Sequence, residues 1–167
     1  MIDAPRNSSG PSPGQGRVYR KDIVVRFTDC DPAGIVFYPR YLEMFNDLVE
    51  SWFREELNFS FNEIVTRRVW GLPTVHLAVD FVAPSIFGEV LSATLSVRSL
   101  GTSSISLDIS LHGRDGVARV RGKVVLVLID RSVGRAIPIP NEVRARIALF
   151  QGLKLYPALH LDKGLNQ

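Results

Sequence analysis

Cysteine and histidine are scarce in this chain of 167 residues, which contains one cysteine and three histidines. The single cysteine, Cys30, cannot form a disulfide within the chain. The histidines (His76, His112 and His160) lie far apart, and no group of residues has the spacing of a zinc site. The sequence therefore predicts neither a disulfide framework nor a metal centre, and a reducing compartment such as the cytoplasm is its natural setting.

Long apolar runs are also missing. No segment approaches the ~18 apolar residues of a membrane-spanning helix, and the start MIDAPRNSSGPSPGQGR lacks the apolar core of a signal peptide. The formal net charge is only +3, and the lysines and arginines are scattered among acids, whereas nucleic-acid binding requires a clustered basic face. We therefore expect a soluble, cytoplasmic protein that binds neither membranes nor nucleic acid, with a positive bias that suits an anionic small ligand.

The length and the apolar content of 46% suit one domain with a sizeable core. Residues 1–16 are crowded with proline, glycine, serine and asparagine, which bury too little surface to order themselves, so we expect a flexible tail there. A single domain is predicted over residues 17–152, and residues 153–167 form a C-terminal extension.

The apolar pattern changes period along this domain. Tyr19–Phe27 has the β-branched content of a strand. Apolar residues then recur at three- and four-residue steps as far as Leu57, which predicts a helix of about five turns with Pro39 at its first position. Two segments, 89–100 and 103–112, alternate apolar and polar residues as half-buried antiparallel strands do. A further strand over 117–129 alternates at first and then becomes the apolar run VVLVLI, which predicts that its second half is covered on both faces, by the helix and a loop or by another subunit. A short helix is predicted over Glu142–Phe150, and the fold class is α+β.

The stretch DCDPAGIVFYPRY, residues 29–41, joins the first strand to the long helix. Backbone N–H groups at a helix start lack partners within the helix and, with the helix dipole, favour an anion, including one that forms in a transition state. Asp31 lies just upstream in a glycine-containing turn. A carboxylate beside such a site can attack a carbonyl carbon or activate water, so acyl transfer or hydrolysis is one interpretation.

Other interpretations of this junction stay open on the residues alone. An aspartate in a turn before proline is common because its side chain bonds nearby backbone. Asp29 and Asp31 could be two ligands of a metal ion, although no further carboxylate or histidine is evident to complete the site. Cys30 could be a nucleophile, although no nearby histidine is apparent to activate it.

The block FTDCDPAGIVFYPRYLEMF resembles the signature of the 4-hydroxybenzoyl-CoA thioesterase family of hotdog-fold proteins. The similarity continues through GLPTVHLAVDFVAPSIFGEVL, LGTSSISLDISL and VVLVLID. The resemblance implies a hotdog fold, in which a five-stranded antiparallel sheet wraps around one long central helix. It also implies homodimers that often assemble into homotetramers, with sites at subunit boundaries.

By this resemblance, Asp31 stands at the catalytic carboxylate, and Tyr38 stands at the helix start whose backbone N–H polarises the thioester carbonyl. Whether Asp31 attacks the carbonyl or acts as a general base on water stays open, and Asp29 is expected to close the turn. The resemblance implies a set of substrate-binding residues, with His76 at the start of the next strand: Phe37, Tyr41, Asn46, Leu72, Pro73, Thr74 and His76.

Two departures from the family pattern concern the substrate. The family's 4-hydroxybenzoyl pattern has an acid on the central helix and a threonine in the Gly-x-Pro loop, where this chain has Asn46 and Leu72. An apolar Leu72 should select less strongly for a hydroxyl. The basic cluster that some relatives carry is also replaced here, so we expect coenzyme A to contact a different set of residues: Arg98, Thr102, Ser103, Ser104 and Arg121, with Arg119 as a further candidate. The arginines of this set can equally form a solvated face.

The leading hypothesis is an acyl-CoA thioesterase that hydrolyses an aromatic thioester, such as benzoyl- or hydroxybenzoyl-CoA, to the free acid and coenzyme A. No cofactor is expected, because coenzyme A is part of the substrate. A thioesterase for short- or medium-chain aliphatic acyl-CoA is one alternative. Another is a non-catalytic module that binds acyl-CoA or an acylated carrier protein, whereas a hotdog dehydratase is disfavoured because no catalytic histidine and acid pair is apparent.

Overall fold

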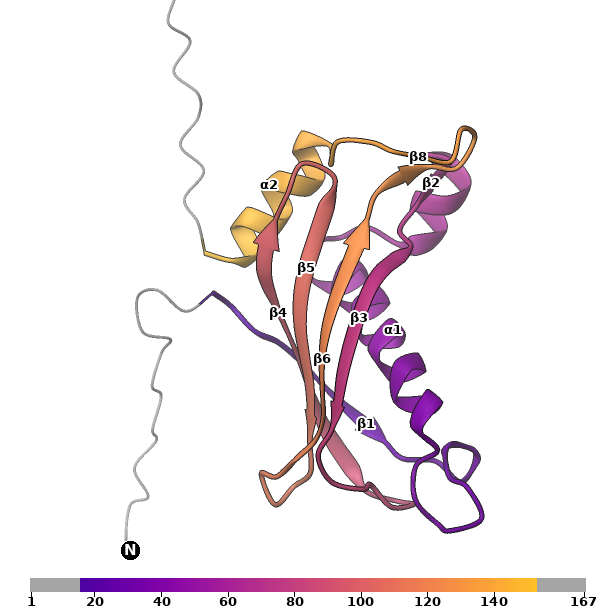
Figure 1. Cartoon of the computed structure of the whole chain (residues 1–167). Coiled ribbons are helices and arrows are strands. Elements are labelled where there is room, and N and C mark those ends of the chain that lie inside the picture. The colour runs from indigo at the N-terminus through magenta and orange to yellow at the C-terminus, as the bar shows by residue number, and fades with distance from the viewer. Residues whose placement is uncertain (1–15, 153–167) are drawn as a thin grey trace, which may run out of the picture.

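The computed structural model describes residues 16–152. Apart from Gly16, the predicted N-terminal tail lies outside this range, as does the predicted extension of residues 153–167. Within the described range, the chain forms a five-stranded antiparallel sheet, a small sheet of three short strands and two α-helices (Figure 1). The predicted α+β class and the five-stranded antiparallel sheet are therefore confirmed.

The five-stranded sheet has the order β1-β4-β5-β6-β3, and all neighbouring strands are antiparallel. Its strands are β1 (Tyr19–Val24), β3 (Thr74–Phe81), β4 (Val90–Leu100), β5 (Ser104–His112) and β6 (Ala118–Val127). The small sheet has the order β2-β7-β8 and consists of β2 (Trp70–Gly71), β7 (Ile129–Asp130) and β8 (Arg135–Ala136). The α-helices are α1 (Tyr38–Glu55) and α2 (Asn141–Phe150), and two single turns have 3-10 and π geometry: η1 (Phe27–Asp29) and η2 (Glu63–Arg67).

The boundaries of α1 and β1 differ slightly from the predicted ones. Pro39 is the second residue of α1 rather than the first, which costs little because N–H groups of the first turn have no acceptor within a helix. The helix ends before Asn58, whose φ of +54° is left-handed and cannot continue it. β1 ends three residues earlier than predicted, because the pairing becomes irregular at Val25, whose N–H bonds the Glu89 carbonyl (2.8 Å) while its carbonyl accepts the Gly88 N–H (3.0 Å), and the chain then turns into η1.

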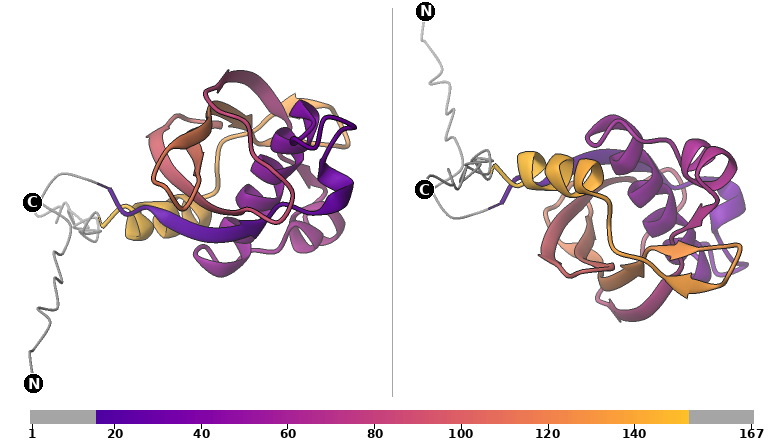
Figure 2. Two further views of the ribbon diagram at one scale, coloured as in Figure 1. Left: turned by 90° about the horizontal axis from the view of Figure 1, so that it is seen from below. Right: turned by 90° about the horizontal axis from the view of Figure 1, so that it is seen from above.

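The five-stranded sheet curves around α1 and encloses its apolar side (Figure 2). The apolar residues of this side recur every three or four positions and include Phe45, Leu48 and Trp52. They belong to one buried cluster with inward residues of the strands, such as Leu95. α2 packs at the end of this core that lies near the C-terminus of α1, where the rings of Trp52 and Phe150 are 5.5 Å apart. The core thus fixes the position of α1 beneath the sheet.

β3 is less well covered than the other strands. The backbone of α1 lies closest to β1 and β4, at the opposite side of the sheet, and α1 meets β3 through the rings of Tyr38 and Tyr41, whose centroids are 6.1 and 6.0 Å from that of Phe81. As a result, apolar side chains of β3 that point toward the helix side remain exposed, with 41% for Leu77 and 52% for Phe81. β3 is also an edge strand, bonded only to β6 (Figure 1). The molecule therefore has an uncovered apolar region between α1 and β3.

A hydrogen bond between β1 and α1 provides a test of how these two elements pack together. The Tyr19 hydroxyl donates to Glu55 Oε2 (2.5 Å), and this bond holds the pKa of Glu55 below its ordinary value. We expect Tyr19→Phe to raise the pKa of Glu55, measured by NMR titration of its side-chain carboxyl carbon. Because the folded-state pKa is lowered, the stabilisation is present above the unfolded-state pKa and is lost as the pH falls through the folded value. An unchanged pKa of Glu55 in Tyr19→Phe contradicts the assignment.

Candidate active site

Residues 29–37, here called the Asp31 loop, fold into a short antiparallel hairpin that leads directly into α1. Phe37 donates its N–H to the Asp29 carbonyl, and Asp31 donates its N–H to the Ile35 carbonyl, both at 2.9 Å. The turn between the two legs is closed by a bond from the Gly34 N–H to the Asp31 carbonyl (2.9 Å). Gly34 has a φ of +78°, which glycine adopts without steric cost. Asp31 is therefore the first residue of a tight, hydrogen-bonded turn.

The two acids of this loop have different environments. Asp29 accepts the Arg26 N–H on Oδ2 (2.7 Å) and closes η1, the architectural role that the sequence predicts for it. Asp31 is half-buried, and its Oδ1 accepts the Ala33 N–H (2.8 Å). Its Oδ2 has no hydrogen-bond donor among the residues that the structure describes. One carboxylate oxygen of Asp31 is thus held by the turn while the other is available.

The start of α1 supplies a hydrogen-bond donor on the same unit of structure. The Tyr38 N–H has no acceptor in the described part of the chain, and no side chain caps this helix end. Pro39 has no N–H, and the Arg40 N–H bonds the Phe37 carbonyl (2.9 Å). The Tyr38 N–H, at the positive end of an 18-residue helix, can therefore stabilise a carbonyl oxygen that gains negative charge.

A cavity of about 180 Å³ lies between α1 and β3, in the region that the helix leaves uncovered, and we call it the α1–β3 cavity. Three of the predicted substrate-binding residues line it: Asn46, Leu72 and Thr74. The rest of its wall is apolar and consists of Leu42, Phe45, Val49, Phe61, Leu77, Val124 and Leu126. Positions 38, 42, 46 and 49 of α1 are spaced by three or four residues, so Tyr38 lies on the helix face that lines the cavity, one turn before it.

Four other residues predicted to bind substrate do not line this cavity. Tyr41 is only 4% exposed, and its hydroxyl accepts the Ser85 N–H (3.2 Å), so it is a core residue. Phe37 is exposed and packs its ring on that of Tyr38, with centroids 5.3 Å apart. His76 pairs with Val125, in the register that points away from the helix. Pro73 lies in the loop before β3, where its carbonyl accepts the Val127 N–H (3.1 Å).

Most of the cavity wall was not predicted as a site. Phe45, Phe61 and Val124 come from α1, the segment before η2 and β6, and they meet only in the folded chain. One sequence signal pointed to this packing: Gly122 stands between Arg121 and Lys123, at an inward position in the alternating part of β6, and a glycine within a strand often marks a close approach. A Cβ atom on Gly122 would lie 2.3 Å from Phe45 Cε2. The wall residue Phe45 is therefore seated directly on the backbone of β6.

The predicted coenzyme A residues are not brought together in one chain. Arg98 is paired with Asp108 (3.8 Å). Thr102 and Ser103 lie in the turn between β4 and β5, where their carbonyls accept the N–H groups of Ile139 and Leu128, both at 2.8 Å, and Ser104 is the first residue of β5. Arg121 lines a groove of about 880 Å³ on the outer face of the sheet, whose other lining side chains include Ser92 and Ser110. Arg119 is engaged by two carboxylates, so it is not a free cation.

In the described residues, no group of three or more histidine, cysteine, aspartate or glutamate side chains is placed to hold a metal ion. No helix in residues 16–152 is long and apolar enough to cross a membrane.

Comparison with known proteins gives consistent results. The sequence profile of the thioesterase-like superfamily matches residues 25–147. A 1,4-dihydroxy-2-naphthoyl-CoA hydrolase from Synechocystis sp. is 26% identical over 119 residues, which cover 70% of this chain and 86% of the relative. A solved gentisyl-coenzyme A thioesterase is 30% identical with a TM-score of 0.66, over 77% of this chain and 99% of that one. The crystal structure of a 1,4-dihydroxy-2-naphthoyl-CoA thioesterase from Synechocystis has a TM-score of 0.74 at 24% identity, over 78% and 96% of the two chains.

Proposed function

Because the chain belongs to the thioesterase-like superfamily and is a thioester hydrolase, we propose that it hydrolyses an aromatic acyl-CoA to the free acid and coenzyme A. Asp31 and the Tyr38 N–H are the reacting groups in this proposal. The observation that carries it is their common setting. An available carboxylate oxygen and an unpaired N–H belong to one hydrogen-bonded loop and helix start, and an apolar cavity begins one helical turn further on.

In the proposed reaction, the acyl group lies in the α1–β3 cavity and the thioester carbonyl lies over the start of α1. The Tyr38 N–H donates to the carbonyl oxygen and stabilises the charge that builds up on it. Asp31 either attacks the carbonyl carbon, to give an anhydride that water then cleaves, or removes a proton from an attacking water. In both routes the C–S bond breaks, and the coenzyme A thiolate leaves and takes up a proton.

The size of the α1–β3 cavity favours one aromatic ring. Its volume of about 180 Å³ is close to that of an engineered apolar cavity of ~150 Å³ that binds benzene. Phe45, Phe61 and Leu72 supply apolar walls, and Asn46 and Thr74 are the polar side chains that could meet a ring substituent. The gentisyl-CoA and dihydroxynaphthoyl-CoA thioesterases to which the chain is similar are named for aromatic substrates, which supports the same class here.

A hydrolysis screen tests this proposal. Purified protein is assayed for thiol release from benzoyl-, hydroxybenzoyl-, phenylacetyl- and aliphatic CoA thioesters. We expect the highest kcat/KM for an aromatic thioester. A preference for short or medium aliphatic chains would support the aliphatic alternative instead, since an apolar cavity can also hold an alkyl chain. Tight binding of coenzyme A without hydrolysis of any thioester would favour a non-catalytic binding module.

Asn46 provides a prediction about ring substituents. A carboxylate at this position could accept a hydrogen bond from a phenolic hydroxyl, and hydrogen bonds to charged groups contribute about 1.5–3 kcal/mol. We expect Asn46→Asp to raise the ratio of kcat/KM for 4-hydroxybenzoyl-CoA over benzoyl-CoA by about 10-fold. Asn141→Asp, which adds the same charge at an exposed position on α2, is the matched control and leaves the ratio unchanged. A ratio that is unchanged, or that moves toward benzoyl-CoA, in Asn46→Asp contradicts the assignment.

We also propose that the functional form is a homodimer or homotetramer, assembled through the uncovered side of β3. Phe37, Tyr38 and Phe81 are between 48% and 59% exposed beside the reacting groups, where a second subunit would cover them. In such an assembly, the residues predicted to bind coenzyme A, which one chain does not bring together, could contact coenzyme A jointly with residues of a second subunit. Molar-mass measurement in solution tests it, and a monomer at micromolar concentration with full activity would oppose it.

A further inference from the structure

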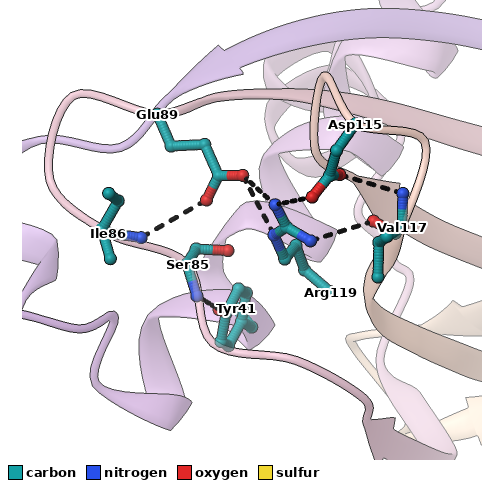
Figure 3. Close-up of polar contacts among 7 residues, drawn as sticks. All are labelled: Tyr41, Ser85, Ile86, Glu89, Asp115, Val117 and Arg119. Atoms are coloured by element: carbon teal, nitrogen blue, oxygen red, sulfur yellow. Dashed lines mark hydrogen bonds and ion pairs between the residues drawn. The ribbon is translucent and has the colours of Figure 1, made fainter.

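Arg119 on β6 binds two carboxylates from other segments (Figure 3). Its Nε and Nη2 donate to Glu89 Oε1 (3.0 and 2.6 Å), and Nη2 also donates to Asp115 Oδ2 (2.9 Å). The side chains of Arg119 and Glu89 are only 11% and 14% exposed. Hydrogen bonds between charged groups are among the stronger ones in proteins, and shielding from water limits their screening by salt. The guanidinium thus joins β6, the hairpin at Asp115 and the segment that enters β4.

This group of side chains fixes residues 82–89, here called the 82–89 loop. The Arg119 carbonyl accepts the N–H groups of Val82 (2.8 Å) and Ala83 (3.2 Å) at the start of the loop. Glu89, at its end, accepts the Ile86 N–H on Oε2 (3.3 Å) while Oε1 is held by Arg119 (Figure 3). Both ends and the middle of the loop are therefore attached to one arginine, directly or through Glu89.

The same loop is the support of the Asp31 loop. Val36 donates its N–H to the Ser85 carbonyl (2.9 Å), and Ile35 forms an antiparallel bridge with Ile86. Ser85 is fully buried, and its N–H bonds the Tyr41 hydroxyl on the first turns of α1 (3.2 Å; Figure 3). A chain of contacts thus runs from Arg119 through Glu89 to Ile86, and from Ile86 and its neighbour Ser85 to Ile35 and Val36, which lie between Asp31 and the helix start.

We propose that Arg119 and Glu89 are positioning residues for hydrolysis, which hold the 82–89 loop so that the Asp31 carboxylate and the Tyr38 N–H keep their relative placement. This inference rests on the proposed function, because those two groups are the reacting ones there. Neither Arg119 nor Glu89 touches the substrate. Their effect passes through the backbone bonds of Ser85 and Val36 to the Asp31 loop.

The backbone beside Arg119 leaves just enough room for its guanidinium group. A Cβ atom on Gly113 would lie 2.2 Å from Arg119 Nη2 and 2.6 Å from Glu89 Oε1. A glycine at this position lets the guanidinium lie against the backbone of the β5–β6 hairpin. Gly113→Ala therefore offers a way to displace Arg119 without removing any charge.

The experiment compares Arg119→Gln and Gly113→Ala with the wild type by steady-state kinetics on benzoyl-CoA and by amide hydrogen exchange. We expect kcat to fall about 10-fold with KM unchanged, since small misplacements of reacting groups are costly. We also expect faster exchange of the Val36 amide, while amides between β4 and β5 stay protected. Arg119→Lys keeps the charge but loses the two-pronged geometry, so its kcat should lie between those of Arg119→Gln and the wild type.

Arg146→Gln is the control for a merely structural role. Arg146 is a half-buried arginine on α2 that donates to the Leu57 carbonyl (2.6 Å), at the other end of α1. Its replacement should lower the melting temperature and leave kcat and Val36 exchange unchanged. The proposal is overturned if Arg119→Gln and Gly113→Ala behave like this control, or if Val36 exchange is unaffected in them. A wild type that hydrolyses no aromatic thioester would overturn the proposed function, whereas the exchange of Val36 would still decide whether Arg119 holds the loop.

Discussion

Asp31→Asn is expected to lower kcat for benzoyl-CoA by about 10²- to 10⁴-fold, the range typical of the loss of a general base. Asparagine is neutral, so it can neither attack a carbonyl efficiently nor accept a proton from water. The fold should persist, because an asparagine Oδ1 can still accept the Ala33 N–H that Asp31 binds at 2.8 Å. Thiol release measures kcat, and thermal unfolding followed by circular dichroism shows whether the structure is kept.

Asp29→Asn is the matched control for this prediction. Asp29 lies two residues earlier, and its carboxylate accepts the Arg26 N–H within η1. The same change of side chain at this position should leave kcat close to that of the wild type. A fully active Asp31→Asn enzyme, or an equal loss of kcat in both variants, would refute the role of Asp31.

Gly122→Ala is expected to produce the second large effect, on both stability and substrate binding. The new Cβ atom would overlap Phe45, whose ring it would meet at 2.3 Å from Cε2. Overpacking of this kind costs about 1–3 kcal/mol of unfolding free energy. The ring can escape mainly toward the α1–β3 cavity that it lines, so the acyl group would lose its place. Burial of an aromatic ring contributes about 1.5–3 kcal/mol, so we expect kcat/KM for benzoyl-CoA to fall by up to about 100-fold.

The double variant Gly122→Ala with Phe45→Leu separates overlap from other causes. Leucine is shorter than phenylalanine, so it should relieve the overlap and recover part of both the stability and kcat/KM. Such a recovery is a coupling between two residues in contact, which a double-mutant cycle measures. Additive losses in the double variant, by urea unfolding and by kinetics, would show that Gly122 and Phe45 do not act on each other.

The parts of the fold that were predicted well are those whose pattern is local. α1 and the strands β4 and β5 each have a clear period of 3.6 or 2, because each buries only one side, whereas β6 alternates only as far as Lys123. Their observed ends differ from the predicted ones by a few residues. The end of β1 was misplaced because its pairing becomes irregular at Val25, which bonds Glu89 and Gly88, more than 60 positions along the chain. Such a bond leaves no trace in the local sequence.

The candidate site also has a part that the local sequence predicts and a part that it does not. Asp31 and Tyr38 belong to one stretch of sequence, so the proximity of turn and helix start could be predicted, although their catalytic roles stay a prediction. The α1–β3 cavity could not, because Phe61 and Val124 reach it only when distant elements pack together. The coenzyme A contacts expected at Arg98 and Arg119 could not be judged from the sequence for a different reason. Both arginines have carboxylate partners on other elements, Asp108 and Glu89, which depend on how the strands pair.

The free edge of β3 has a consequence for the growth of assemblies. Its sequence, TVHLAVDF, contains no proline and one charged residue, so it lacks the usual features that stop an edge strand from adding another. A head-to-tail addition at such an edge leaves a new free edge and can continue into a fibre. Two copies related by a two-fold axis would instead pair their β3 edges with each other, and the edges left free would be the two β1 strands, which carry the charged residues Arg20, Lys21 and Asp22. If the subunits pair in this way, the β3 edge is protected from further addition, and we expect variants that disturb β3 to precipitate before they lose their fold.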